Sequence, residues 1–260
     1  RMHRTFLALP LLGLAAGPPG PGNAAEELCM EGRLAPRFFL LGAQKAGTTS
    51  LYFDLVQSRG VAGPAGQLKE LFFFDNSSRY SQGRQFYLSH YPKCSEAPGL
   101  VAIDCSTTYL FTPEVPRRIA DFYGERRRGL LFLVLLREPA DRAQSAWYHH
   151  RARGRFTGNE SFRGFVQSFL TDGGDRESVV RGSLYAEQLA RYFAAFDASH
   201  FIVAPYRLNT AQTSGRSLAD LVLDELGAPR APRWSLERLI YEHAKGHTNV
   251  HAHPPLQEDL

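Results

Sequence analysis

The sequence predicts a single α/β domain, in which a central parallel sheet is flanked by helices. Short apolar runs that are typical of buried strands alternate along the chain with stretches of helical spacing. A glycine-rich turn links the first of these strands to the first helix. The length of 260 residues and the hydrophobic content of 43% suffice for one sizeable core.

The elements follow one another in strand–helix order. The predicted strands are residues 37–41, 100–104, 130–136 and 201–204. The third of them is continuously apolar, as expected of a strand covered on both faces. The predicted helices are residues 49–58, 113–123, 140–150 and 218–226. In the second of these, Val115, Ile119 and Phe122 fall on one face.

Residues 1–25 are predicted to be a signal peptide or a signal anchor. Basic residues precede the apolar run 6–16, and small residues suited to cleavage follow it. The run is shorter than the ~20 residues of a bilayer span, which favours a cleaved signal peptide. Residues 26–36 are then expected to be a linker, and residues 37–260 the functional domain.

A secretory route agrees with two further features. Asn76 and Asn159 each begin a sequon for N-glycosylation. An oxidising compartment would allow the three cysteines one disulfide and one free thiol. Cys94 and Cys105 would close a short loop and are the expected pair, which leaves Cys29 unpaired.

The stretch 40–52, LLGAQKAGTTSLY, is predicted to hold a phosphate-like anion. Its backbone N–H groups lie where a helix begins, and the helix dipole there favours negative charge. The residues expected to bind the anion are Lys45, Gly47, Thr48, Thr49 and Ser50. An ordinary strand-to-helix turn with a good cap is the alternative.

The position of Lys45 separates this loop from the triphosphate loop G-x-x-x-x-G-K-[ST], whose lysine follows the second glycine. Thr48 stands at that place here. A sulfuryl group is a smaller anion that can be transferred without a metal, and a lysine within the loop could reach the bridging oxygen between phosphate and sulfate. Sulfuryl transfer is therefore expected, with a phosphate-loop kinase or nucleotide hydrolase as the alternative.

A second motif, LLREPADRAQSAWYHH, spans residues 135–150. Arg137 ends a predicted strand, and Ser145 lies on the helix that follows. A guanidinium fork and a hydroxyl at one sheet edge could clamp a second phosphate, with Arg142 as a helper. A surface arginine and an ordinary helical serine are the alternative.

Together the two motifs resemble the nucleotide-binding elements of sulfotransferases that use 3′-phosphoadenosine 5′-phosphosulfate. Three more stretches resemble the heparan sulfate branch of that family, the glucosaminyl N- and 3-O-sulfotransferases. They are LKELFFFD at 68–75, DCSTTYLFTPEVPRRI at 104–119 and KGHTN at 245–249. The resemblance covers residues 38–249 and implies the sulfotransferase fold, a single α/β domain similar to that of the phosphate-loop nucleoside triphosphatases.

The resemblance also implies roles. Glu70 would be the general base, and Lys45 would stabilise charge on the leaving phosphate oxygen. The hydroxyl residues 48–50 would hold the 5′-phosphate, and Arg137 with Ser145 the 3′-phosphate. A late loop would close the nucleotide pocket with Lys245, Gly246, His247 and Thr248. Without the resemblance, Glu70 and its neighbour Lys69 would be taken for a surface ion pair.

Two departures from the branch concern the acceptor. Cys105 follows Asp104 where the branch has a lysine, which raises the alternative of a non-catalytic glycan-binding relative. The cysteine pair that 3-O members carry before their late loop is missing from this chain.

The expected acceptor is a polysaccharide or glycan. Lys69, Arg151 and Arg153 are expected to meet it, and the arginine runs 126–128 and 151–155 could line a groove for an anionic chain or be solvated faces. Nucleic acid is excluded as a partner because no basic stripe with interleaved aromatics occurs. No metal is expected, and a membrane would be met only through the N-terminal segment. The resemblance implies the Golgi lumen or membrane, with secretion as the alternative.

Overall fold

A computed structural model describes residues 28–228, apart from residues 59, 67, 157–159 and 211–216. The predicted leader, residues 1–25, and the late loop 245–249 therefore lie outside the described residues. No helix within the described ranges combines the length and the apolar character needed to cross a bilayer.

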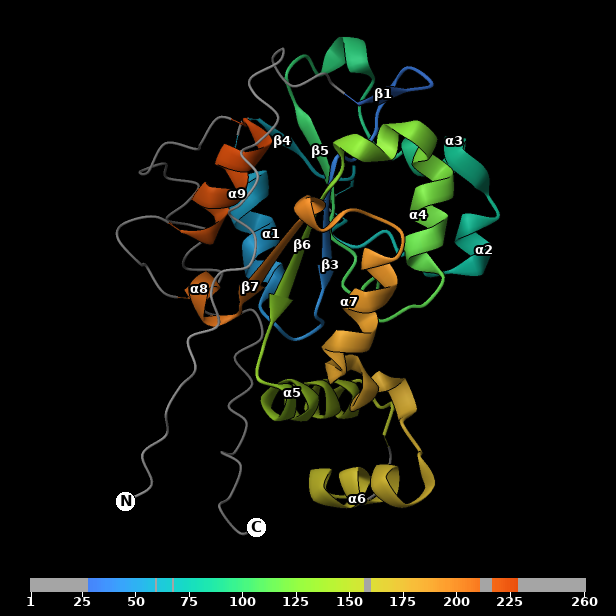
Figure 1. The fold of residues 1–260 in the computed structure, drawn as a ribbon, viewed down its shortest axis with the longest axis vertical. Helices are drawn as coiled ribbons and strands as arrows, with labels where there is room; N and C mark the ends of the chain where they lie inside the picture. The colour runs from blue at the N-terminus through green and yellow to red at the C-terminus, as the bar shows by residue number, and fades with distance from the viewer. Residues whose placement is uncertain (1–27, 59, 67, 157–159, 211–216, 229–260) are drawn as a thin grey trace.

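The core of the protein is a five-stranded sheet in the order β4-β5-β3-β6-β7, and every neighbouring pair is parallel (Figure 1). Its strands are β3 (Phe38–Gly42), β4 (Val61–Ala62), β5 (Val101–Asp104), β6 (Leu131–Leu136) and β7 (Phe201–Pro205). All of β3 and β5 is buried, as is the middle of β6. The predicted parallel sheet is thus confirmed.

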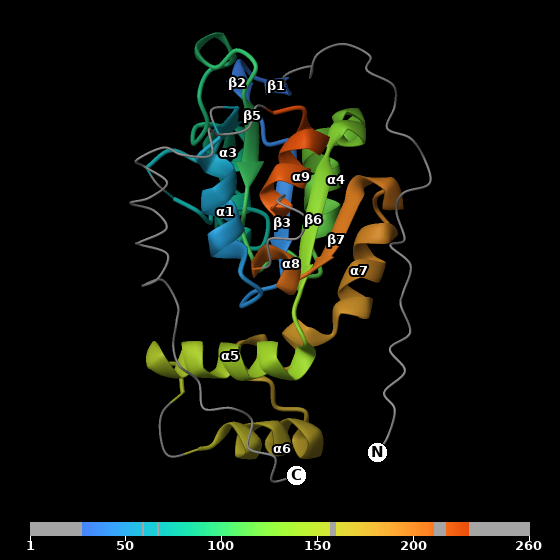
Figure 2. The same ribbon diagram turned by 90° about the vertical axis from the view of Figure 1, so that its left-hand side faces the viewer.

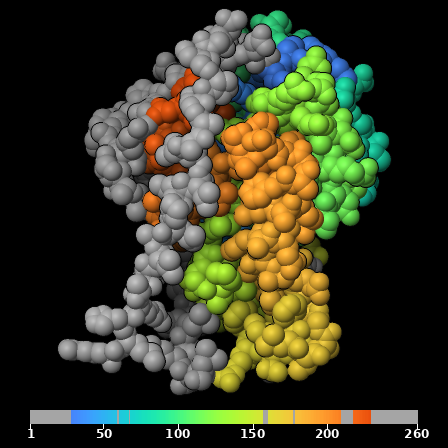
Figure 3. Space-filling view, in the orientation of Figure 1, coloured from blue at the N-terminus to red at the C-terminus, as the bar shows by residue number. Residues whose placement is uncertain are grey.

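Helices cover both faces of the sheet (Figures 1 and 2). On one face α1 (Thr48–Val56) packs against α9 (Leu218–Leu226), and the other face carries α4 (Val115–Tyr123) and α7 (Tyr185–Phe193). Two helices, α5 (Pro139–Ala152) and α6 (Phe162–Asp172), lie beyond the carboxyl ends of the strands. Figure 3 shows α4 in green and α7 in orange on the outer surface above them.

The remaining elements are short. The α-helices among them are α2 (Ser77–Tyr80), α3 (Gly83–Leu88) and α8 (Arg207–Thr210). The 3₁₀ helices are η1 (Cys94–Glu96), η2 (Gly124–Gly129), η3 (Arg176–Ser178), η4 (Arg181–Ser183) and η5 (Ala198–His200).

Two very short strands, β1 (Cys29–Met30) and β2 (Arg33–Leu34), form an antiparallel pair within the stretch predicted as a linker. The disulfide joins Cys29 to Cys94, so the expected pairing of Cys94 with Cys105 is wrong. Cys105 follows β5 directly and is wholly buried in the core, whereas the Cys94 backbone N–H bonds the Gly32 carbonyl of the β1–β2 turn at 3.0 Å. Cys105 thus lies in the core at the end of β5, whereas the β1–β2 turn holds Cys29 next to Cys94.

Removing this disulfide by the double change Cys29→Ser and Cys94→Ser is expected to destabilise the fold. The cysteines are 65 residues apart in sequence, and constraining so long a loop in the unfolded chain stabilises the native state by about 4 kcal/mol. Urea unfolding of the variant and of the oxidised protein measures the difference. A decrease of less than about 1 kcal/mol in the free energy of unfolding would show that the disulfide contributes little beyond the contacts of the β1–β2 hairpin.

The strand order also fixes where a ligand can bind. The strand β3, first of the five in the chain, lies between β5 and β6, so the direction in which strands are added reverses on its two sides. In open parallel sheets, ligands bind at the carboxyl ends of the strands beside such a switch point. The segments that follow β3, β4, β5 and β6 carry the residues described next.

Candidate functional site

The loop between β3 and α1 is tightly built. Gly42 begins it with a φ of +149°, and a Cβ at that position would lie 3.0 Å from the Thr107 carbonyl oxygen and 3.1 Å from Leu110 Cβ. Only glycine therefore fits against the segment that follows β5. Lys45 and Gly47 have φ values of +69° and +79°, which turn the backbone into α1.

The amino end of α1 matches the predicted anion site. Gly47 is the N-cap, and Thr48, Thr49 and Ser50 are the first three helical residues. No acidic residue lies in the first turn of α1, so no carboxylate there offsets the positive end of the helix dipole. The arrangement favours an anion at this helix terminus.

Positive charge gathers beside the loop. Arg137, which follows β6, donates a hydrogen bond from Nη1 to the Lys45 carbonyl at 3.2 Å, and its guanidinium lies 5.3 Å from the ring centroid of Tyr206. The Tyr185 hydroxyl donates to the Arg137 carbonyl at 2.9 Å. Burial lowers the pKa of Lys45, and the charges of Arg137 and Arg153 lower it further. A bound anion would relieve this repulsion.

Glu70 lies next to the same loop and is held at both of its oxygens. The Lys69 ammonium is 2.6 Å from Oε1, and the Thr107 hydroxyl donates to Oε2 at 3.1 Å. Lys69 also reaches Thr48 Oγ1 at 3.4 Å, so its ammonium bridges Glu70 and the amino end of α1. The side chain of Glu70 keeps 22% of its surface exposed, which leaves it open to a substrate.

The second motif is only partly assembled around Arg137. Ser145 is buried on α5 with 4% exposure, and within the described ranges no hydrogen bond joins it to Arg137. Arg142 is 1% exposed, and its guanidinium donates to Ser183 Oγ at 2.6 Å and to the Val179 carbonyl. Its Nη1 also donates to the Gln44 carbonyl of the loop after β3 at 3.5 Å, so Arg142 ties α5 both to the η3–η4 segment and to that loop. Its role as a helper for phosphate stays a prediction.

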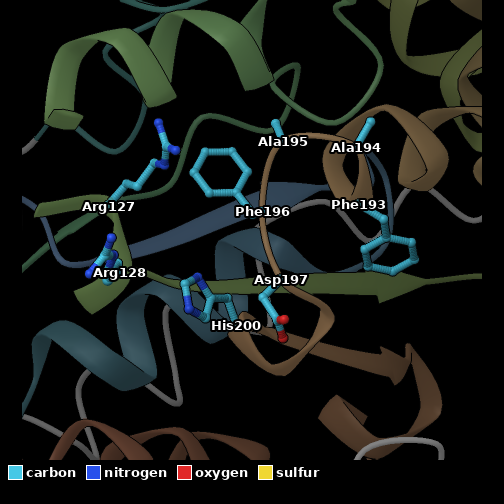
Figure 4. A pocket seen from close by; sticks show the side chains of 8 residues that line it. All are labelled: Arg127, Arg128, Phe193, Ala194, Ala195, Phe196, Asp197 and His200. Atoms are coloured by element: carbon cyan, nitrogen blue, oxygen red, sulfur yellow. The ribbon is translucent and has the colours of Figure 1, made fainter. Parts of the chain in front are cut away.

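The two arginine runs lie at opposite ends of the strands. Arg151 on α5 donates to the Glu160 carbonyl at 2.7 Å and lies over Trp147, and Arg153 caps the same helix. Arg127 and Arg128 precede β6 and line a separate hollow of about 400 Å³ with residues 193–197 and His200 (Figure 4). The run 126–128 thus lies at the amino end of β6, remote from the loop after β3.

Thr107 is the site residue that the sequence does not single out. It lies within the stretch 104–119, but its contact with Glu70 depends on β5 bringing the segment 105–107 beside the segment that follows β4. The only sequence signal is its place just after a predicted strand, where the strands of a parallel sheet present their ligand-binding ends. The four residues predicted in the late loop lie outside the described residues.

No family model matches the chain. In sequence it is similar to bifunctional heparan sulfate N-deacetylase/N-sulfotransferases. It is 27% identical to form 1 of Homo sapiens over 207 residues, which cover 74% of the chain and 22% of that protein. It is 34% identical to form 2 of Homo sapiens over 121 residues, or 46% of the chain and 13% of that protein. The chain thus spans at most about a fifth of the length of these curated relatives.

Solved sulfotransferases share its fold. A sulfotransferase from Alicyclobacillus acidocaldarius superposes with a TM-score of 0.60 over 82% of the chain and 91% of that structure, at 24% identity. The sulfotransferase domain from the curacin biosynthetic pathway superposes with a TM-score of 0.51 over 77% of the chain and 76% of that domain, at 15% identity. The predicted fold and the predicted resemblance to the heparan sulfate branch are both confirmed.

Proposed function

We propose that this relative of the heparan sulfate sulfotransferases moves a sulfuryl group from 3′-phosphoadenosine 5′-phosphosulfate to a hydroxyl or amine of a heparan sulfate-like polysaccharide. One observation supports it above all. Lys69 joins Glu70 to Thr48, at 2.6 and 3.4 Å, so a proton acceptor and an anion loop share one edge of the sheet. A group transfer to a nucleophile that must lose a proton needs this combination.

In the proposed reaction, the acceptor oxygen or nitrogen forms a bond to sulfur while the bond from sulfur to the bridging oxygen breaks. The proton of the acceptor passes to Glu70. Negative charge develops on the leaving phosphate oxygen, and the Lys45 ammonium stabilises it. Lys69 and Thr107 orient the carboxylate by holding one oxygen each.

The donor would be bound at both ends. Residues 47–50 at the amino end of α1 are proposed to hold its 5′-phosphate, and Arg137 with Ser145 its 3′-phosphate. Residues 245–248 are proposed to close the pocket. Arg153, whose charge acts on Lys45, and Arg151 on the same helix are proposed to meet the anionic acceptor. The proposed site of action is the Golgi, within the secretory pathway.

Two assays separate this proposal from its alternatives. Titration calorimetry with adenosine 3′,5′-bisphosphate in the presence of EDTA tests the nucleotide, with ATP and Mg²⁺ in parallel. Transfer of radiolabelled sulfate to a panel of glycans tests the reaction. Binding and transfer are both expected without a metal. Preference for ATP with Mg²⁺ would indicate a kinase or hydrolase, and glycan binding without transfer a non-catalytic relative.

Replacing Arg137 with alanine is expected to weaken bisphosphate binding by about tenfold to a hundredfold, because a charge-assisted bond from a guanidinium contributes ~1.5–3 kcal/mol. Calorimetry on the two proteins measures the ratio of dissociation constants. Arg117→Ala is the matched control, since Arg117 lies on α4 with 77% of its side chain exposed. Equal affinities of the Arg137 variant and the control would remove Arg137 from the nucleotide site.

A further inference from the structure

Asp104, the last residue of β5, is a buried carboxylate with hydroxyl partners only. Its exposure is 0%. Oδ1 accepts a hydrogen bond from Ser106 Oγ at 2.8 Å, and Oδ2 accepts from the hydroxyls of Tyr87 and Tyr109 at 2.8 and 2.9 Å. No cation of the described residues forms an ion pair with it. A buried charge of this kind is costly, and packing alone gives no reason for it.

Two of the three hydroxyls continue to the backbone that follows Glu70. Ser106 Oγ accepts from the N–H groups of Leu71 and Phe72, both at 3.1 Å. The Tyr109 oxygen accepts from the N–H of Phe73 at 3.1 Å and, more weakly, from that of residue 74 at 3.4 Å. Phe72 has a φ of +49°, a conformation that a bulky residue adopts only when its surroundings hold it there.

The charge of Asp104 sets the direction of these bonds. An ionised carboxylate only accepts, so the protons of Ser106 and Tyr109 point toward it and their lone pairs face the N–H groups of residues 71–74. If Asp104 instead carried a proton or an amide N–H, one hydroxyl would have to accept from it. Where that hydroxyl is Ser106 or Tyr109, which also accept from the turn, it keeps one lone pair fewer for the backbone N–H groups.

We propose that Asp104 is a positioning residue for Glu70, which it places by fixing, through Ser106 and Tyr109, the backbone turn of residues 71–74. The segment 104–107, which contains Asp104 and Ser106, also presents Thr107, whose hydroxyl holds Glu70 Oε2. This inference rests on the proposed role of Glu70 as the base. Neither Asp104 nor the two hydroxyls touches the substrate in this scheme.

The scheme gives the reaction an acidic limit. Burial raises the pKa of Asp104 to about 6, although its three hydroxyl partners oppose the rise. Turnover is therefore expected to fall as the pH drops through about 6, where Asp104 takes up a proton and the hydroxyl directions change. The titratable groups around it are Tyr52, Asp75, Tyr87, Tyr91, Cys105, Tyr109, Tyr123 and Tyr192. Burial raises the pKa of the phenols and the thiol, so of this group only Asp75 also titrates on the acid side.

Two tyrosine variants form a matched pair for the test. Tyr87→Phe and Tyr109→Phe each remove one hydroxyl bond to the same Asp104 oxygen, but only the Tyr109 hydroxyl also accepts from the turn. Tyr109→Phe and Ser106→Ala are expected to lower kcat about tenfold, as a lost hydrogen bond that holds the base permits. KM for the nucleotide should not change. Tyr87→Phe is expected to lower kcat clearly less than Tyr109→Phe does. Equal losses of kcat in the two tyrosine variants would overturn the relay, by which we mean the hydrogen bonds from Asp104 through Ser106 and Tyr109 to the backbone of residues 71–74.

Asp104→Asn tests the charge itself. The variant is expected to lower kcat at neutral pH and to lose the acidic limb near pH 6 that the wild-type protein shows. A limb that persists in Asp104→Asn would belong to another group, such as Asp75, and would contradict the assignment. A role in folding alone would change the thermal stability of the variant but would leave the shape of its pH profile the same.

Backbone hydrogen exchange makes the relay testable without turnover. At a single pH, the amides of residues 71–74 should lose protection in Tyr109→Phe and Ser106→Ala and keep it in Tyr87→Phe. Unchanged protection in all three would refute the relay, whatever the activity. If the variants show the expected pattern of protection but the wild-type protein transfers no sulfate, the proposed function is contradicted and the relay is not.

Discussion

Glu70→Gln is expected to abolish sulfuryl transfer while sparing nucleotide binding. Glutamine has the shape of glutamate and keeps an oxygen for the Thr107 hydroxyl, but its amide cannot take the acceptor's proton. Loss of a general base lowers the rate by about 10²–10⁴-fold. Radiolabelled sulfate transfer measures kcat, and calorimetry with adenosine 3′,5′-bisphosphate measures binding in the same preparation.

Glu125→Gln is the matched control for this change. Glu125 lies in η2 at the far end of β6, 82% exposed and paired with Arg128, so its loss should leave transfer unchanged. If the Glu70 variant transfers sulfate at the rate of this control, Glu70 is not the base. If it also fails to bind the nucleotide, the loss would reflect damage to the loop through Lys69.

Lys45→Ala is expected to lower kcat by about 10²–10³-fold, the usual effect of removing a group that stabilises developing charge. Alanine keeps the Cβ, so the left-handed backbone at this position, with a φ of +69°, is no worse accommodated than with lysine. Nucleotide affinity should fall as well, because the ammonium offsets the charge of the bound anion. Single-turnover transfer separates the chemical step from binding.

The pH dependence of nucleotide affinity supplies the second measurement on Lys45. Burial and the charges of Arg137 and Arg153 lower the pKa of Lys45, so its charge is lost at a lower pH than an ordinary lysine requires. Affinity of the wild-type protein should therefore weaken on the alkaline side before the ordinary lysine range, and that limb should vanish in Lys45→Ala. Lys93→Ala is the control, since Lys93 is 58% exposed and paired with Glu96. An alkaline limb that survives in Lys45→Ala would point to another group.

Long, regular elements could be predicted from the sequence, and short or tertiary features could not. The helix 218–226 has the predicted bounds because an apolar face and a capping serine mark it. The strand β4 has two residues and depends on pairing with β5, so no local pattern indicates it. Neither α6 nor α7 is among the predicted helices, although the apolar residues of both have helical spacing.

In the candidate site too, local features could be predicted from the sequence and contacts between distant segments could not. Glycine and lysine spacing predicts the loop after β3, since its backbone chemistry is local. The contact of Thr107 with Glu70 and the burial of Arg142 arise from packing between distant segments, which spacing does not encode. The expected pair Cys94–Cys105 is wrong for the same reason, because the disulfide joins Cys94 to a residue 65 positions away in sequence.

Each part of this site follows a different strand, so the parts come together only when β3, β4, β5 and β6 have paired. The segments that follow β3, β4, β5 and β6 contain Lys45, Glu70, Thr107 and Arg137, respectively. These strands pair in an order different from their order in the chain. Such non-local pairing forms slowly during folding. The chain should therefore gain its activity in one late step. A fragment that ends before residue 131, and so lacks β6 and Arg137, should have no activity.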